Sequence, residues 1–226
     1  DTILCLSANS QKLYHVGIGN KIAKSTLSKA NENRNCKIYH DLAMLLIKEA
    51  QQLYINDSDL EVEIKNNVFA IDATTIDVCL SAFWWAKFRT TKGGIKVHTQ
   101  LDLKTSIPEF VHITTAAVHE VNVMDFITYL PESFYVIDRG YTDFQRLYHI
   151  HQTHAFFIIR AKDNLRFNRI GSAPVDKNKG VLCDQHIRLN NFYAAKEYPE
   201  QLRRIKFFDT ENNRTLVFLT NNFDLK

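Results

Sequence analysis

The spacing of apolar residues changes near residue 66, from a helical period to a strand period. Before this point apolar residues recur at steps of three, four and seven, which is typical of amphipathic helices. The clearest series is Ile38, Leu42, Leu45, Leu46 and Leu53. After it, short runs of β-branched and aromatic residues alternate with turn residues. The pattern therefore predicts a helical lead-in over 1–66, followed by a region of strands.

The strand region predicts a mixed sheet of the α/β class. Strands are expected at 68–78, 94–103, 110–115, 134–137 and 155–159, and helices at 121–130 and 142–151. Thr142 and Gln145 have the capping-box spacing that would begin the second helix. The 94–103 strand alternates, so we expect one face in the core and the other, with Lys96, His98 and Gln100, in water. A meander followed by right-handed crossovers accounts for this order of elements.

After Asp163 the chain becomes polar and rich in turn residues. Further strands are expected at 204–208 and 215–220, separated by a turn at 211–213. We interpret 164–226 as a small β-rich insertion. The first residue is Asp1 rather than Met, and the chain stops soon after the last strand, so we expect a piece of a longer reading frame.

Composition narrows the class of protein. Of the 226 residues, 45% are hydrophobic, and only 7 are Gly and 4 are Pro, which excludes a disordered or collagen-like chain. The 4 cysteines lack the paired spacing of a zinc finger. No apolar run reaches the roughly 20 residues of a membrane helix. The formal net charge of +3 is too small to identify a partner, so charge has to be considered locally.

Two aspartates stand out because apolar strand residues flank them. Asp72 lies inside the 68–78 strand, and Asp138 ends the buried 134–137 strand. A buried carboxylate needs compensation, and the carboxyl end of a parallel strand opens into the crevice where ligands bind. As an alternative, Asp138 caps the next turn or pairs with Arg139, and Asp72 pairs with a lysine. Two such carboxylates would suit hard divalent cations, and two-metal phosphoryl transfer usually adds a third acid.

Three segments carry a family resemblance. They are 71–77 (IDATTID), 84–98 (WWAKFRTTKGGIKVH) and 135–141 (YVIDRGY). These segments resemble the DDE transposases of bacterial insertion sequences, in particular the insertion-sequence-four family. The resemblance implies an RNase H-like catalytic domain, whose first part would span 67–163. It also implies that Asp72 and Asp138 are catalytic carboxylates that bind metal.

The resemblance further implies an activity, a cofactor and partners. The activity would be metal-dependent DNA cleavage and strand transfer in cut-and-paste transposition. Magnesium would be the cofactor, with manganese as the alternative, and double-stranded DNA would be bound as transposon ends and as target. We expect a homodimer on DNA, associated with the nucleoid in the bacterial cytoplasm and not with a membrane. Two other functions stay open, a non-catalytic DNA-binding remnant of a transposase and another RNase H-like nuclease.

The last acid of the resembled family lies in a Tyr-x-x-Arg-x-x-x-Glu-x-x-x-x-x-x-Lys pattern, and no tyrosine of this chain begins that spacing. Glu197, Glu200 and Glu211 follow Asp138 but lie in the polar region, so we assign the role to none of them. We therefore predict a final catalytic helix beyond residue 226 and incomplete catalysis by this chain. His119-Glu120 follows the third strand, where the family often has a His-acid pair; a helix start is favoured over catalysis.

Basic residues gather in three places. The residues predicted to bind DNA are Lys87, Arg89, Lys92, Lys96, Arg139, Tyr141, Arg160 and Lys162. The first four alternate with aromatic residues, among them Trp84 and Trp85, which would stack on bases or else pack in the core. The lead-in from Lys12 to Lys37 is basic too, and a solvated helix face and a DNA contact are equal alternatives there.

Overall fold

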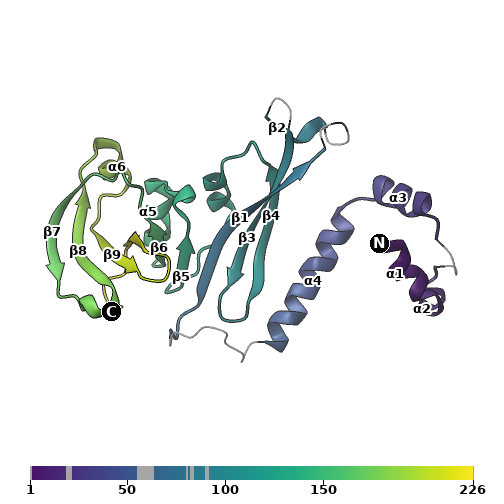
Figure 1. Ribbon diagram of the computed structural model, residues 1–226, viewed down its shortest axis with the longest axis horizontal. Helices are drawn as coiled ribbons and strands as arrows, with labels where there is room; N and C mark the ends of the chain where they lie inside the picture. Colours follow the sequence, from purple (N-terminus) through teal and green to yellow (C-terminus); the bar gives the residue numbers. More distant parts are fainter. Residues whose placement is uncertain are drawn as a thin grey trace. The chain divides into compact units, whose positions relative to one another are not determined.

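The computed structural model describes residues 2–18, 22–54, 64–79, 81, 84–89 and 92–225, and the side chains of Phe88 and Arg89 lie outside the described part. The chain divides into two compact units, Asp1–Gln52 and Leu53–Lys226. Figure 1 shows the helices of the first unit and the sheet of the second.

The first unit is helical. Its elements are α1 (Thr2–Ala8), α2 (Ser10–His15), α3 (Lys24–Asn33) and α4 (Lys37–Leu53). Leu13 is the one buried residue among those described in this unit, and Ile38, Leu42 and Leu45 of α4 are more than half exposed. The apolar stripe expected on α4 is therefore present and open. No helix in the described residues is long and apolar enough to cross a bilayer.

A 10-stranded sheet forms the second unit. Its first strands are β1 (Val68–Val78), β2 (Lys87–Arg89), β3 (Lys92–Asp102), β4 (Ile107–Thr115), β5 (Phe134–Ile137) and β6 (Phe156–Arg160). β3 pairs antiparallel with both β1 and β4, whereas β5 is parallel to β1 and to β6. The order β4-β3-β1-β5-β6, with β3 reversed against its neighbours, is that of an RNase H-like sheet. The predicted fold class is confirmed.

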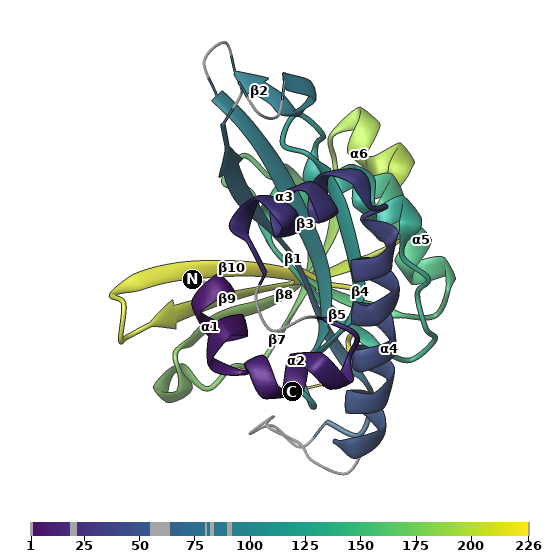
Figure 2. The same cartoon turned by 90° about the vertical axis from the view of Figure 1, so that its right-hand side faces the viewer.

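The remaining strands extend the same sheet. They are β7 (Phe167–Ala173), β8 (Val181–Leu189), β9 (Leu202–Asp209) and β10 (Arg214–Thr220). They pair antiparallel in sequence, and β10 also pairs with β6. Figure 2 shows β9 and β10 crossing the direction of β1 and β3, as expected when twist accumulates along a sheet. The β-rich region is thus continuous with the main sheet rather than appended to it.

β7 and β8 are strands that the sequence pattern did not predict. Their residues mix polar and apolar types, and the β7–β8 register shifts between Arg169 and Gly171. Such an irregularity breaks the alternation by which a strand is recognised in sequence.

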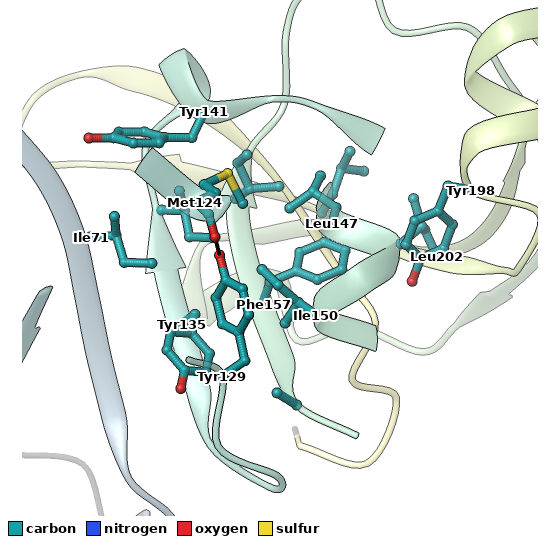
Figure 3. Close-up of a cluster of buried hydrophobic side chains, with 14 of the residues drawn as sticks. Ile71, Met124, Tyr129, Tyr135, Tyr141, Leu147, Ile150, Phe157, Tyr198 and Leu202 are labelled. Atoms are coloured by element: carbon teal, nitrogen blue, oxygen red, sulfur yellow. Dashed lines mark hydrogen bonds between the residues drawn. The ribbon is translucent and has the colours of Figure 1, made fainter. Parts of the chain in front are cut away.

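The main core lies between the middle of the sheet and α5 (Phe144–Gln152). Figure 3 shows its largest side chains, contributed by β5, β6, α5 and the segment around α6 (Phe192–Glu197). Tyr135, Phe157 and Tyr198 are each fully buried. The apolar runs of β5 and β6 are buried because sheet neighbours and α5 cover them.

The helix predicted over 121–130 is wrong. The structure has a short 3₁₀ helix, η2 (Glu120–Phe126), followed by extended chain. Tyrosine hydroxyls provide the bonds that a helix would have made: Tyr129 donates to the Met124 carbonyl at 3.2 Å, and Tyr135 accepts from the Leu130 amide at 2.8 Å. These tertiary contacts override the local period.

The start predicted for the next helix is displaced by one residue. Asp143 caps α5 by accepting from the Arg146 amide at 3.0 Å. Thr142 instead donates its hydroxyl to the Arg139 carbonyl at 2.8 Å, within the turn η3 (Arg139–Tyr141).

The two faces of β3 are reversed relative to the prediction. His98 and Gln100, expected in water, are 0% and 4% exposed, whereas Val97 and Leu101 are only partly buried. Part of the polar face finds hydrogen-bond partners, although His98 Nδ1 has none among the described residues. His98 Nε2 lies 2.9 Å from the Thr114 hydroxyl, and Gln100 donates to Glu109 at 3.3 Å.

Candidate functional site

Asp72 and Asp138 follow a matched pair of residues on neighbouring parallel strands. Ile71 of β1 is the register partner of Ile137 of β5. The next residue on each strand is an aspartate, so the two carboxylates leave the sheet at the same level. Both aspartates are exposed, which leaves their oxygens accessible to a ligand. That the two aspartates share one metal site stays a prediction.

Of the structural roles considered for these aspartates, a turn cap is present and the ion pairs are not found among the described residues. Asp138 caps the η3 turn, because its Oδ2 accepts from the Gly140 amide at 3.3 Å. Among the described residues, however, neither Asp72 nor Asp138 forms an ion pair with a lysine or with Arg139. The turn bond engages one carboxylate oxygen of Asp138. Asp72 has no cation within ion-pair distance among the described residues.

The phenol of Tyr141 is buried and is influenced by the charges of both aspartates. Its side chain is 0% exposed, and Figure 3 shows its hydroxyl end directed toward β1, away from the other core residues. Burial raises the pKa of Tyr141, and the negative charges of Glu120, Asp72 and Asp138 raise it further. The phenol therefore stays protonated and can donate a hydrogen bond, and the charges of three carboxylates act on it.

A third carboxylate, Glu120, belongs to the same neighbourhood. It begins η2, and its Oε1 lies 3.2 Å from Lys96 Nζ. Lys96 also donates to the Val118 carbonyl at 3.1 Å, so both partners are fixed by the loop after β4. The sequence marked Glu120 only as a helix start with a less favoured catalytic role.

Gly140 is the point at which these groups meet. A Cβ added to Gly140 would lie 2.9 Å from Glu120 Oε2 and 3.7 Å from Asp138 Oδ2. The first distance is shorter than a side chain tolerates. A glycine at this position therefore makes room for the Glu120 carboxylate beside the turn that Asp138 caps.

The donor set suits a hard divalent cation, which prefers carboxylate oxygens. In the part of the chain that the structure describes, no three His, Cys, Asp or Glu side chains converge as a closed metal site. Asp72 and Asp138 could hold such an ion together with water molecules, which Mg²⁺ usually retains.

Two residues of the predicted DNA-binding set are not available for DNA. Tyr141 is fully buried, and its hydroxyl has no hydrogen-bond partner among the described residues. Lys96 has a side chain only 12% exposed and is engaged by Glu120. Both belong to the interior of the site, where the sequence pattern alone could not place them.

Other members of that set lie at the surface. Lys87, Lys92, Arg139 and Lys162 are exposed, and Arg160 is half-buried; the Arg89 side chain lies outside the described residues. Arg139 and Lys162 line one open hollow together with Gly140, Asp163 and Asn164. Positive charge therefore flanks Asp138. Trp84 is 79% exposed and Trp85 is 53% exposed, so neither packs in the core. The alternative that some of the four aromatic residues here are buried stays open, because Phe83 and the Phe88 side chain lie outside the described residues.

The downstream glutamates lie in the 164–226 region. Glu197 ends α6, Glu200 precedes β9, and Glu211 lies in the β9–β10 turn. Glu197 lines a pocket together with Thr142 and Lys162. The third acid stays unassigned among the three.

A family model described as the transposase DDE domain matches residues 63–225. The chain belongs to the DDE transposase family. The match includes both strand aspartates and Glu120. This family generally uses a divalent metal ion, in agreement with the oxygen donors found here. The resemblance to DDE transposases stated from the motifs is confirmed.

The chain is also similar to curated bacterial proteins. It is 24% identical over 205 residues to a protein of Geobacillus stearothermophilus named as a transposase for insertion sequence element IS5377, covering 88% of this chain and 51% of that protein. It is 25% identical over 158 residues to one of Synechocystis sp. named for element IS4SA, covering 68% and 44%. The chain thus spans about half the length of these relatives.

A solved structure gives a weaker likeness. The piggyBac transposase, solved as a synaptic complex with hairpin DNA, matches with 9% identity and a TM-score of 0.41 over 70% of this chain and 34% of that one.

Proposed function

We propose that this chain is the larger part of a transposase catalytic core, in which Asp72 and Asp138 are the first two catalytic carboxylates. The observation that carries the proposal is their placement after the register pair Ile71 and Ile137, on adjacent parallel strands. Together with the family match, it supports cleavage of a phosphodiester at an element end and transfer of the freed 3′-hydroxyl to target DNA. Magnesium is the proposed cofactor, and manganese is the alternative.

The residues of this chain would hold and orient the reacting groups. A magnesium ion bound by Asp72 and Asp138 would supply Lewis-acid activation of a phosphodiester. Arg139 and Lys162, beside Asp138, would neutralise and position the scissile phosphate. The buried face beneath the carboxylates, with Tyr141, limits water to one side of the site.

Double-stranded DNA, as element end and as target, is the proposed partner. Lys87 begins β2 and Lys92 begins its antiparallel partner β3, and the exposed Trp84 precedes Lys87 by three residues. These residues would offer phosphate contacts and a stacking surface. The basic residues of the helical lead-in would add contacts that carry no sequence information. Assembly as a homodimer on DNA in the bacterial cytoplasm, at the nucleoid, completes the proposal.

A non-catalytic DNA-binding remnant is the second candidate function. It would apply if the complete protein also lacks the glutamate pattern of the family, which does not occur in residues 139–226. Such a chain would bind element ends through its basic surface without cleaving them.

The test uses the complete reading frame and a duplex that carries the end of its own element. Strand nicking is measured with Mg²⁺ for the unchanged protein, Asp72→Asn and Asp138→Asn, with Asp77→Asn as the matched strand control. We expect each site variant to lose on the order of a hundred- to a thousandfold in rate. Equal rates in all four proteins would contradict the assignment. DNA binding without nicking by the unchanged protein would select the remnant.

A further inference from the structure

Glu120 has three neighbours that a simple helix start does not require. Lys96 pairs with one of its oxygens at 3.2 Å, and Gly140 leaves space for the other, which a Cβ would approach to 2.9 Å. The third neighbour is the phenol of Tyr141, whose pKa its charge raises together with those of Asp72 and Asp138. The Glu120 carboxylate therefore lies beside the Gly140 turn, the turn that Asp138 caps.

The buried phenol provides an independent sign of a ligand. Tyr141 Oη is buried and has no hydrogen-bond partner among the described residues. A buried hydroxyl without a partner costs about 1–3 kcal/mol, so a native site ordinarily supplies one. Figure 3 shows this hydroxyl directed toward β1, the strand that carries Asp72. A water held between the carboxylates would satisfy the phenol.

If Asp72 and Asp138 ligate the ion, as proposed above, Glu120 has to act through water. No three acidic or imidazole side chains within the described ranges converge closely enough to share an ion directly. Mg²⁺ usually retains several waters and takes only one or two carboxylates as direct ligands. A carboxylate just outside that set accepts hydrogen bonds from the waters and orients them. Lys96 pairs with Glu120 and so offsets one of the three negative charges. This lowers the electrostatic repulsion among the three carboxylates.

We propose that Glu120 is a third carboxylate of the site, which holds the divalent cation through its bound water while Asp72 and Asp138 ligate it directly. The proposal rests on the proposed function of the two aspartates. Glu120 precedes Asp138 in the chain, so it is distinct from the later glutamate expected in the family pattern. Lys96 is its positioning residue, and Gly140 is the residue that admits it.

The first test measures metal binding and does not depend on catalysis. Mn²⁺ is titrated into the 226-residue chain, and the free ion is followed by its electron paramagnetic resonance signal. Glu120→Gln preserves the shape and the Lys96 hydrogen bond but removes the charge, so we expect the dissociation constant to rise roughly tenfold. Asp125→Asn is the matched control, because it breaks the ion pair to Arg146 from the same η2 segment. This control should leave Mn²⁺ affinity unchanged.

Gly140→Ala gives a second test that does not alter any charged group. The added methyl would meet the flexible end of Glu120 and displace its carboxylate, so the fold should survive while Mn²⁺ affinity falls in the same direction. Tb³⁺, another oxygen-seeking ion, locates the site: its luminescence on tyrosine excitation should fall in Tyr141→Phe.

The outcomes separate this inference from the proposed function. If Glu120→Gln and Gly140→Ala bind Mn²⁺ as tightly as the unchanged chain while Asp72→Asn and Asp138→Asn do not, the role of Glu120 is overturned and the site of the two aspartates stands. If the aspartate variants also bind normally, the proposed metal site itself fails. Unchanged Tb³⁺ luminescence in Tyr141→Phe would place the ion elsewhere and contradict the inference.

Discussion

Lys96 Nζ lies 3.2 Å from Glu120 Oε1, and this ion pair joins the middle strand β3 to the η2 segment that follows β4. The Lys96 side chain is only 12% exposed, and Glu120 is 34% exposed. The pair therefore lies between the limits of a surface salt bridge and a buried one. It fixes the loop that carries Glu120 against the sheet that carries Asp72.

Replacing Lys96 with Met should destabilise the second unit by about 1–3 kcal/mol. The Met stem retains most of the packing, but Glu120 and the Val118 carbonyl lose their donor. Urea unfolding at neutral pH measures the change. Lys92→Met, at an exposed position on the same strand, is the control and should leave the midpoint unchanged. Equal midpoints for the two variants would show that the ion pair does not stabilise the fold.

Much of the sheet around the site could be predicted from sequence, because its strands carry strong local signals. The β-branched run of β1 and the apolar run of β5 are visible without any partner, and their parallel pairing places Asp72 beside Asp138. The segment after β4 could not be predicted. Its chain follows hydrogen bonds from Tyr129 and Tyr135, which are tertiary contacts with no local signature.

The position of Tyr141 shows a second limit of prediction from sequence. In sequence it follows Asp138-Arg139-Gly140 and resembles a surface contact to DNA, but the η3 turn directs it under the sheet edge. Likewise, the sequence predicts that Lys96 contacts a phosphate. In the structure it instead forms an ion pair with Glu120, which is distant in sequence. Burial and pairing of charged or polar residues depend on long-range neighbours, so local patterns do not reveal them.

Asp184 and Arg203 should be essential to the stability of the outer sheet. The Arg203 guanidinium donates to both Asp184 oxygens, with Nη2 2.7 Å from Oδ2, and both side chains are at least 90% buried. Asp184→Ala would leave a buried guanidinium without its partner, at a cost of about 3–5 kcal/mol. Thermal unfolding measures the loss. Asp209→Ala breaks a pair with Arg214, whose side chain is 54% exposed, and should shift the midpoint far less.

Stability should fall as pH decreases through the range in which histidine titrates. Burial lowers the pKa of His98 below its usual value of 6.5, and the charges of Lys96 and His112 lower it further. Because the unfolded chain binds this proton more readily than the folded one, the contribution is present above about pH 6.5 and is lost on acidification. Urea unfolding at a series of pH values measures the slope.

The matched variants for this test are His98→Asn and His149→Asn. His98→Asn should flatten the dependence between about pH 7 and pH 5, because the group that binds the extra proton is gone. His149 lies on the exposed surface of α5, and its replacement should leave the slope unchanged. A slope unaffected by His98→Asn would assign the pH dependence to other groups.

Affinity for duplex DNA should fall steeply as salt increases, because phosphate contacts release counterions. Fluorescence anisotropy of a labelled duplex at several salt concentrations gives the slope. Arg139→Ala and Lys162→Ala, in the hollow beside Asp138, should each reduce the slope by about one. Lys177→Ala, an exposed lysine in the turn η4 (Lys177–Lys179), is the control. An affinity that is indifferent to salt would remove DNA as the partner of this chain.

The 226-residue chain should bind element ends but nick them poorly. The proposed function gives this chain two direct metal ligands, Asp72 and Asp138, whereas two-metal phosphoryl transfer needs a further acidic ligand to fix both ions. If Glu120 acts through water, it orients the ion but does not replace that ligand. Losing one preorganised electrostatic element costs on the order of a hundred- to a thousandfold in rate.

The measurement compares 3′-nicking of an element-end duplex with Mg²⁺ by this chain and by the complete reading frame. Equal rates would show that a residue within this chain supplies the missing ligand, and Glu120→Gln and Glu197→Gln would then distinguish the two glutamates.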